Sequence, residues 1–112
     1  MKKLRVGIAG FGIVGKRRFY YINKNKSLKV VAVCDQNFKK EFDDENGVKH
    51  FKNYKSLLNL NLDILFVALP NYLASEVVIL GLENDLHVFC EKPPGKSVND
   101  IENVIVAQQK KP

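Results

Sequence analysis

The stretch that decides the fold runs over residues 6–15, Val6-Gly7-Ile8-Ala9-Gly10-Phe11-Gly12-Ile13-Val14-Gly15. It joins an apolar segment to a helix through three glycines spaced G-x-G-x-x-G. In such a turn Gly10 permits the tight bend, Gly12 lets a pyrophosphate approach the backbone, and Gly15 lets the helix and strand pack closely. The helix begins with free N–H groups and a partial positive charge that attract phosphates. The stretch therefore predicts a site for a dinucleotide.

A carboxylate follows the second apolar segment of the chain. Residues 29–34, Lys-Val-Val-Ala-Val-Cys, lead into Asp35, twenty residues beyond the third glycine. A carboxylate at this place accepts hydrogen bonds from the adenosine ribose, and its charge repels a 2′-phosphate. Gln36 and Asn37 follow, and no arginine stands there to receive that phosphate. Residues 1–35 are thus predicted to form a dinucleotide-binding βαβ unit that prefers NAD over NADP.

Apolar segments alternate with helical or loop segments along the whole chain. Five apolar segments are expected to be strands: Leu4–Ala9, Val30–Cys34, Val48–Phe51, Ile64–Leu69 and Leu86–Cys90. Helices are expected at residues 15–25, 36–47, 56–61 and 73–84, and after Ser97, which would cap the last of them. This alternation predicts an α/β doubly wound parallel sheet of the Rossmann type in the order 3-2-1-4-5. Its ligand crevice should lie over the carboxyl ends of strands one and four.

The first helix is expected to turn an apolar side to the sheet. Val14, Tyr21 and Ile22 are the residues predicted on that side. Arg17 and Arg18 are predicted to project outward near the start of the helix.

Size and composition restrict the class of protein. With 112 residues, 46% hydrophobic and 27% charged, the chain is expected to form one folded domain. No apolar run approaches the roughly 20 residues of a membrane span, so no membrane partner is expected. Cys34 and Cys90 suit neither a disulfide framework nor a metal site. They are predicted to be buried free thiols of a protein in the reducing cytoplasm.

The net charge of +6 raises nucleic acid as a partner. The lysines are scattered through the sequence, however, and no helix-turn-helix, zinc-finger spacing or basic stretch with interleaved aromatic residues accompanies them. No nucleic-acid partner is expected.

A second stretch, His87-Val88-Phe89-Cys90-Glu91-Lys92-Pro93, ends the fifth apolar segment with Glu-Lys-Pro. Together with the glycine turn, Asp35 and Leu69-Pro70-Asn71, it resembles the Gfo/Idh/MocA oxidoreductases (glucose–fructose oxidoreductase and inositol dehydrogenase) over essentially the whole chain. The resemblance implies that the cofactor contacts Gly10, Phe11, Gly12, Ile13, Val14, Gly15, Asp35, Leu69, Pro70, Asn71, Glu91 and Lys92.

The resemblance also implies a catalytic role for Lys92. In the family this lysine lies beside the nicotinamide and hydrogen-bonds the substrate hydroxyl that loses hydride. It acts either as a base, which requires a lowered pKa, or as a fixed hydrogen-bond donor. Because neighbouring strand residues point to opposite faces, Glu91 is expected to face away from it. Pro93 is expected to position Lys92.

The chain departs from the family pattern at two places. Many members carry P-N-x-x-H, whereas this chain has Ala74 at the histidine position. It also stops before the family's usual sixth strand and its C-terminal substrate domain. Residues 1–112 are therefore expected to be a truncated NAD(P)-binding Rossmann domain, either a fragment or a product without its partner domain, and inactive in isolation.

The expected function follows from the resemblance. The intact protein would be an NAD-dependent oxidoreductase that removes hydride from a secondary hydroxyl of a polyol or sugar substrate: a sugar, cyclitol or sugar nucleotide. The alternatives are a stand-alone, non-catalytic NAD(H)-binding module and a protein used only for partner contacts. An exposed sheet edge, where the sixth strand would lie, predicts a homo-oligomer.

Overall fold

The computed structural model describes residues 2–92 and 95–110. The strands are β1 (Leu4–Ala9), β2 (Leu28–Cys34), β3 (Phe42–Asp43), β4 (Lys49–Phe51), β5 (Ile64–Val67) and β6 (His87–Cys90). The helices are α1 (Ile13–Lys24), α2 (Tyr54–Leu58), α3 (Asn71–Glu83) and α4 (Val98–Lys110). None of the helices in this described part combines the length and apolarity that a membrane span requires.

The strands form one sheet in the order β3-β4-β2-β1-β5-β6. All pairings are parallel except that of β3 with β4. The five predicted strands therefore have the predicted order 3-2-1-4-5, and the doubly wound Rossmann fold is confirmed. Strand β3 was not predicted and extends the sheet at one edge.

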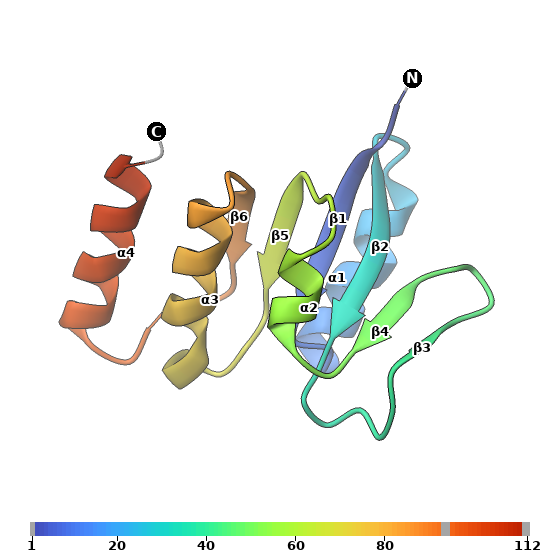
Figure 1. The fold of residues 1–112 in the computed structure, drawn as a ribbon, viewed down its shortest axis with the longest axis horizontal. Coiled ribbons are helices and arrows are strands. Elements are labelled where there is room, and N and C mark those ends of the chain that lie inside the picture. Colours follow the sequence, from blue (N-terminus) through green and yellow to red (C-terminus); the bar gives the residue numbers. More distant parts are fainter. Residues whose placement is uncertain (1, 93–94, 111–112) are drawn as a thin grey trace.

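Helices cover the two faces of the sheet unequally. Helix α1 lies behind β1 and β2, whereas α2 and α3 cover the other face and α4 packs beside α3 (Figure 1). The larger core cluster, which includes Leu57, Leu65 and Val77, lies under α2 and α3. The smaller cluster, which includes Ile8, Val33 and Ile22, lies under α1. Because β1, β2, β4 and β5 run parallel to one another, their carboxyl ends meet at one edge of the sheet.

The predicted orientation of α1 was partly wrong. Ile22 is buried as expected, but Tyr21 is 60% exposed and Val14 is 39% exposed. The side facing the sheet is instead formed by Gly15, Phe19 and Ile22, which follow the helical spacing i, i+4, i+7. Glycine contributes no apolar signal, so the sequence pattern located this side one residue away from its true position.

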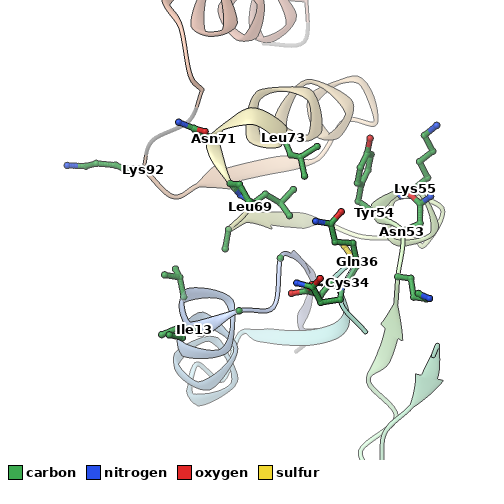
Figure 2. Close-up of a pocket in the computed structure, with 18 residues that line it drawn as sticks. Ile13, Cys34, Gln36, Asn53, Tyr54, Lys55, Leu69, Asn71, Leu73 and Lys92 are labelled. Atoms are coloured by element: carbon green, nitrogen blue, oxygen red, sulfur yellow. Dashed lines mark hydrogen bonds between the residues drawn. The ribbon is translucent and has the colours of Figure 1, made fainter. Parts of the chain in front are cut away.

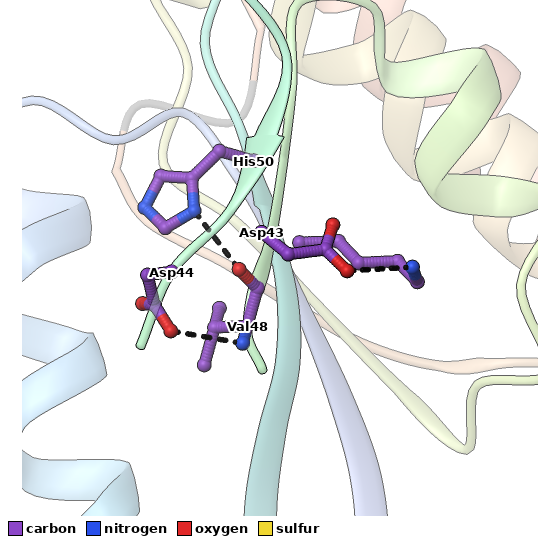
Figure 3. Close-up of polar contacts among 5 residues, drawn as sticks. Asp43, Asp44, Val48 and His50 are labelled. Carbon is purple, nitrogen blue, oxygen red and sulfur yellow. Dashed lines mark hydrogen bonds and ion pairs between the residues drawn. The ribbon is translucent and has the colours of Figure 1, made fainter. Parts of the chain in front are cut away.

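The predicted helix over residues 36–47 was wrong. The segment forms turns, the short strand β3 and a hairpin into β4. Asp44 Oδ1 accepts hydrogen bonds from the N–H groups of Asn46 and Val48, and Gly47 has a φ of +79°, so the backbone forms a tight turn instead of a helix. Figure 3 shows the Asp44–Val48 contact beside the ion pair of Asp43 with Lys49.

A buried imidazole holds this hairpin against the rest of the fold. His50 Nδ1 lies 3.1 Å from the carbonyl oxygen of Val48 (Figure 3). Its ring stacks on Phe42 at 4.2 Å between centroids. It also lies tilted against Phe38 at 5.3 Å and meets Phe11 edge-to-face at 6.0 Å. Sequence analysis gave His50 no role, and the structure places it in an aromatic cluster that reaches the glycine turn.

Candidate functional site

A cavity of about 920 Å³ opens at the edge where the strands end (Figure 2). Nine of the residues predicted to bind the cofactor line it: Gly10, Gly12, Ile13, Val14, Asp35, Leu69, Pro70, Asn71 and Lys92. They come from four separate parts of the sequence, which follow β1, β2, β5 and β6 and which the parallel sheet brings together. Three further predicted residues, Phe11, Gly15 and Glu91, do not line the cavity.

The three glycines of the turn meet different surroundings. Gly10 has a φ of +97°, and a Cβ there would lie 2.4 Å from the carbonyl oxygen of Ala68. A Cβ on Gly15 would lie 1.9 Å from the carbonyl oxygen of Gly10. Next to Gly12, by contrast, a Cβ would meet no atom within 4 Å. The fold therefore requires Gly10 and Gly15, while Gly12 leaves open space on the cavity side.

Helix α1 presents its amino end to this space. Gly12 is its N-cap, with no side-chain hydrogen bond to the first turn, and no acidic residue lies in that turn. Ile13 and Val14 carry the first helical N–H groups and line the cavity. Free N–H groups and the helix dipole favour an anionic group here. A diphosphate fits this amino end because Gly12 carries no side chain and the first turn of α1 holds no acidic residue.

Asp35 joins the glycine turn to the end of β2. Its Oδ2 accepts a hydrogen bond of 3.0 Å from the Phe11 N–H, and its Oδ1 accepts one of 2.9 Å from the Asn37 N–H. Each carboxylate oxygen can accept a further hydrogen bond, and Asp35 lines the cavity. The carboxylate is thus held in place while acceptor capacity remains for a ligand hydroxyl.

One wall of the cavity was not found from the sequence. It consists of Lys52, Asn53, Tyr54 and Lys55, which follow β4 and begin α2. The Asp35 N–H donates to the carbonyl oxygen of Phe51 at 3.0 Å, so this wall starts directly beside Asp35. The strand order already contained this information, because residues that follow neighbouring parallel strands must lie side by side.

Tyr54 closes the cavity toward α3. Its hydroxyl donates to Glu76 Oε1 at 2.9 Å. Burial raises the pKa of the Tyr54 hydroxyl above its ordinary value, and the hydrogen bond and charge of Glu76 raise it further. The hydroxyl therefore stays protonated and serves as a fixed donor between α2 and α3.

The opposite wall is formed where β5 passes into α3. Pro70 is the N-cap of α3, and its carbonyl oxygen accepts the N–H groups of Leu73 and Ala74. Leu69, Pro70 and Asn71 line the cavity as predicted. Ala74, at the family's histidine position, is fully buried in the core cluster under α3. In this chain the position serves core packing.

Glu91 and Lys92 point to different places, as the sequence predicted. The Glu91 N–H donates to the carbonyl oxygen of Val67 at 2.9 Å, which extends the pairing of β5 and β6. The Glu91 carboxylate pairs with Arg18 of α1. Lys92 is exposed at the cavity edge, and its side chain extends away from the residues around Gln36 and Cys34 (Figure 2). Pro93 lies outside the described residues.

Both cysteines are free thiols. Cys34 lines the inner end of the cavity, and burial raises its pKa to about 12. Cys90 is half-buried. Burial raises its pKa as well, and the negative charge of Glu91 raises it further. Neither thiol forms a reactive thiolate near neutral pH.

Comparison with known proteins identifies this arrangement. Residues 4–112 match the family model described as "Oxidoreductase family, NAD-binding Rossmann fold". The chain is 30% identical over 113 residues to inositol 2-dehydrogenase of Salmonella typhimurium, covering 96% of this chain and 34% of that protein. It is 30% identical over 105 residues to 2,7-anhydro-N-acetylneuraminate hydratase of Escherichia coli, covering 93% and 28%.

Solved structures agree with these relatives. The fold matches myo-inositol 2-dehydrogenase of Lactobacillus plantarum with a TM-score of 0.82 and 28% identity, over 98% of this chain and 34% of that one. It matches the WlbA dehydrogenase of Bordetella pertussis, solved with NADH and UDP-GlcNAcA, with a TM-score of 0.86 and 26% identity, over 97% and 35%. The chain spans about a third of the length of these proteins. The family model and the fold together show that the chain belongs to the Gfo/Idh/MocA oxidoreductase family and corresponds to its NAD-binding Rossmann domain.

Proposed function

We propose that the cavity binds NAD in an extended form between Asp35 and Lys92. The diphosphate would lie over Gly12 and the amino end of α1, and the adenosine ribose would donate hydrogen bonds to Asp35. The observation that carries this proposal is the open space at Gly12 beside a fixed carboxylate. The relative solved with NADH supports it.

The NAD preference rests on the charge and contacts of Asp35. A 2′-phosphate would bring a second negative charge next to a carboxylate that two backbone N–H groups already hold in place. Lys52 and Lys55 line the same wall, but both are exposed, so solvent screens their attraction for a phosphate.

The reaction we propose is the oxidation of a secondary hydroxyl on a sugar, cyclitol or sugar nucleotide. Bound NAD would supply the hydride acceptor. Lys92 Nζ would hydrogen-bond the substrate oxygen and hold or accept its proton, while Pro70 and Asn71 would border the nicotinamide. The names of the relatives, among them inositol 2-dehydrogenase and D-glucoside 3-dehydrogenase, support this substrate class. The substrate domain would be a further part of the protein.

The wider setting belongs to the same proposal. Two free cysteines and no disulfide in the described residues suit the cytoplasm. Strand β6 ends the described sheet with one edge unpaired, which suits a homo-oligomer. Scattered lysines without a base-reading element argue against a nucleic-acid partner. Light scattering of the purified chain would test the oligomer, since a monomer at high concentration contradicts it.

Parallel titrations with NADH and NADPH, followed by fluorescence, test the cofactor proposal. Saturable NADH binding tighter than NADPH binding is expected. Asp35→Ala should weaken NADH by roughly tenfold, because a charge-assisted contact to the ribose is lost. Lys39→Ala, at an exposed position outside the cavity lining, is the control and should change neither titration. A folded wild-type chain that binds neither nucleotide would refute the proposal and favour a protein used for partner contacts.

A further inference from the structure

Arg18 makes a contact that links helix α1 to the end of strand β6. Its guanidinium pairs with Glu91 through Nε and a terminal nitrogen, although the residues lie 73 positions apart. The guanidinium carbon also lies 5.5 Å from the centroid of the Phe89 ring. The sequence predicted that Arg18 would project outward near the start of α1. Instead it extends from α1 to the end of β6.

The sheet order makes this contact significant. Helix α1 packs over the central strands β1 and β2, while β6 lies beyond β5 at an edge of the described sheet. On the α1 face near β6, the Phe66 and Phe89 rings lie 5.0 Å apart, and Phe89 is 46% exposed. Arg18 lies against this partly uncovered surface with a side chain that is only 37% exposed. Its contact to Phe89 is of the cation–π kind, which favours arginine over lysine.

This contact joins two parts of the proposed cofactor site, the diphosphate position at the amino end of α1 and the nicotinamide end at Lys92. Helix α1 starts at Gly12, where we place the diphosphate, and Glu91 directly precedes Lys92. The Glu91 backbone is fixed by its hydrogen bond to Val67, and its side chain is fixed by Arg18. The ion pair also occupies a carboxylate that would otherwise attract the neighbouring ammonium group of Lys92.

We propose that Arg18 is a positioning residue that, through Glu91 and Phe89, holds Lys92 at a fixed place relative to the glycine turn. The proposal rests on the proposed function, because it assumes that the nicotinamide lies beside Lys92. It assigns Arg18 no contact with cofactor or substrate.

Two ligands that differ only at the nicotinamide end provide the test. ADP-ribose shares the adenosine, the diphosphate and the second ribose with NADH but lacks the nicotinamide. Arg18→Ala should weaken NADH binding by roughly fivefold, since one charge-assisted contact that orders this end is lost, and should leave ADP-ribose binding within about twofold. Arg17→Ala removes the same charge from an exposed neighbour and should change neither. Arg18→Lys should restore part of the loss, because the charge remains without the planar fork.

Acetylation of Lys92, measured by peptide mass spectrometry, separates the positioning of Lys92 from a general effect of Arg18 on folding. In the wild type, NADH should slow acetylation of Lys92. In Arg18→Ala this protection should decline while the melting curve stays that of a folded protein. Where Arg18→Ala does not fold, Glu91→Gln removes the ion pair with little change in shape and is expected to give the same pattern.

Three outcomes would overturn the proposal. Equal losses for NADH and ADP-ribose would make Arg18 a general structural residue. Unchanged NADH affinity together with unchanged protection of Lys92 would show that the ion pair positions nothing. A folded wild-type chain that binds neither ligand would refute the proposed function itself, and this result is distinguishable from the other two because they require wild-type binding.

Discussion

Two regions of the candidate site, the glycine turn and the surroundings of Lys92, are built in different ways. At the glycine turn, position is fixed by backbone contacts that leave no room for a side-chain atom, as at Gly10 and Gly15. At Lys92, position depends on one strand hydrogen bond and one ion pair, that of Arg18 with Glu91. The glycine turn follows β1, which lies between β2 and β5 in the sheet. Lys92 follows β6, which lies at the edge of the described sheet.

The two regions should therefore tolerate different substitutions. Close packing of backbone atoms resists any change in volume, because the surrounding atoms cannot move aside cheaply. A partly exposed ion pair such as that of Arg18 with Glu91 contributes on the order of 1 kcal/mol to stability, so it directs a side chain without holding the fold together. Substitutions at Gly10 and Gly15 should therefore act on folding. Substitutions at Lys92 should act on ligand chemistry alone.

The largest effect is expected for Gly15→Ala. The new Cβ would lie 1.9 Å from the Gly10 carbonyl oxygen, so α1 must move away from β1. We expect a loss of at least about 3 kcal/mol in the free energy of unfolding, or no folded protein. Urea unfolding followed by circular dichroism would measure it.

Gly12→Ala is the matched control, because its Cβ enters open space and its φ of −80° suits alanine. Its free energy of unfolding should lie within about 0.5 kcal/mol of that of the wild type. It should nevertheless weaken NADH binding, because the methyl group occupies the diphosphate space. Equal stability of the two alanine variants would contradict the steric account of the glycine turn.

The two cysteines allow the pH dependence of stability to be compared at two places in the site. Cys34 directly precedes Asp35, and Cys90 directly precedes Glu91. Above pH 9 the unfolded Cys34 thiol loses its proton, while the folded thiol keeps it until about pH 12. The unfolded state then binds fewer protons, so stability falls as pH rises through this window. Between pH 9 and 11 the stability of the wild type relative to Cys34→Ala should fall by about 2 kcal/mol.

Cys90→Ala makes the same comparison near Lys92, at the end of β6. The pKa of Cys90 is raised in the same direction, but the residue is only half-buried, so its pH-dependent contribution should be smaller. Urea midpoints of the three proteins at pH 8, 9, 10 and 11 give both slopes. A pH-independent difference between wild type and Cys34→Ala would show that the buried thiol is not held protonated.

A smaller effect is expected for Phe42→Ala, which tests the support of the glycine turn from the β3–β4 hairpin. The variant removes the ring stacked on His50, whose imidazole meets Phe11. Because Phe42 is 42% exposed, the loss should be about 1 kcal/mol in the free energy of unfolding. Hydrogen exchange of the Phe11 N–H, which donates to Asp35, should become faster. An unchanged exchange rate of the Phe11 N–H would show that the hairpin does not support the glycine turn.

The sequence predicted the features that depend on neighbours along the chain. The strand order and the glycine turn follow from apolar runs and glycine spacing, and both are confirmed. The hairpin at residues 42–51 was missed because β3 has two residues and owes its place to rings brought in from elsewhere, such as Phe11. The contact of Arg18 was missed for the same reason, since its partner lies 73 residues away. Contacts between distant residues have no local pattern.

The smallest effect on folding is expected for Lys92→Ala, and it gives the sharpest contrast with Gly15. Lys92 is exposed and forms no ion pair among the described residues, so its removal should change the free energy of unfolding by less than about 0.5 kcal/mol. If the protein carries the proposed substrate domain, the same variant of that longer form should lower turnover by at least about a hundredfold, because a positioned proton-transfer group is lost. Stopped-flow measurement of NADH formation, with cofactor affinity determined separately, tests both parts. Unchanged turnover with unchanged affinity would remove Lys92 from the mechanism, whereas a large loss of stability would mean that this end of the site is as tightly built as the glycine turn.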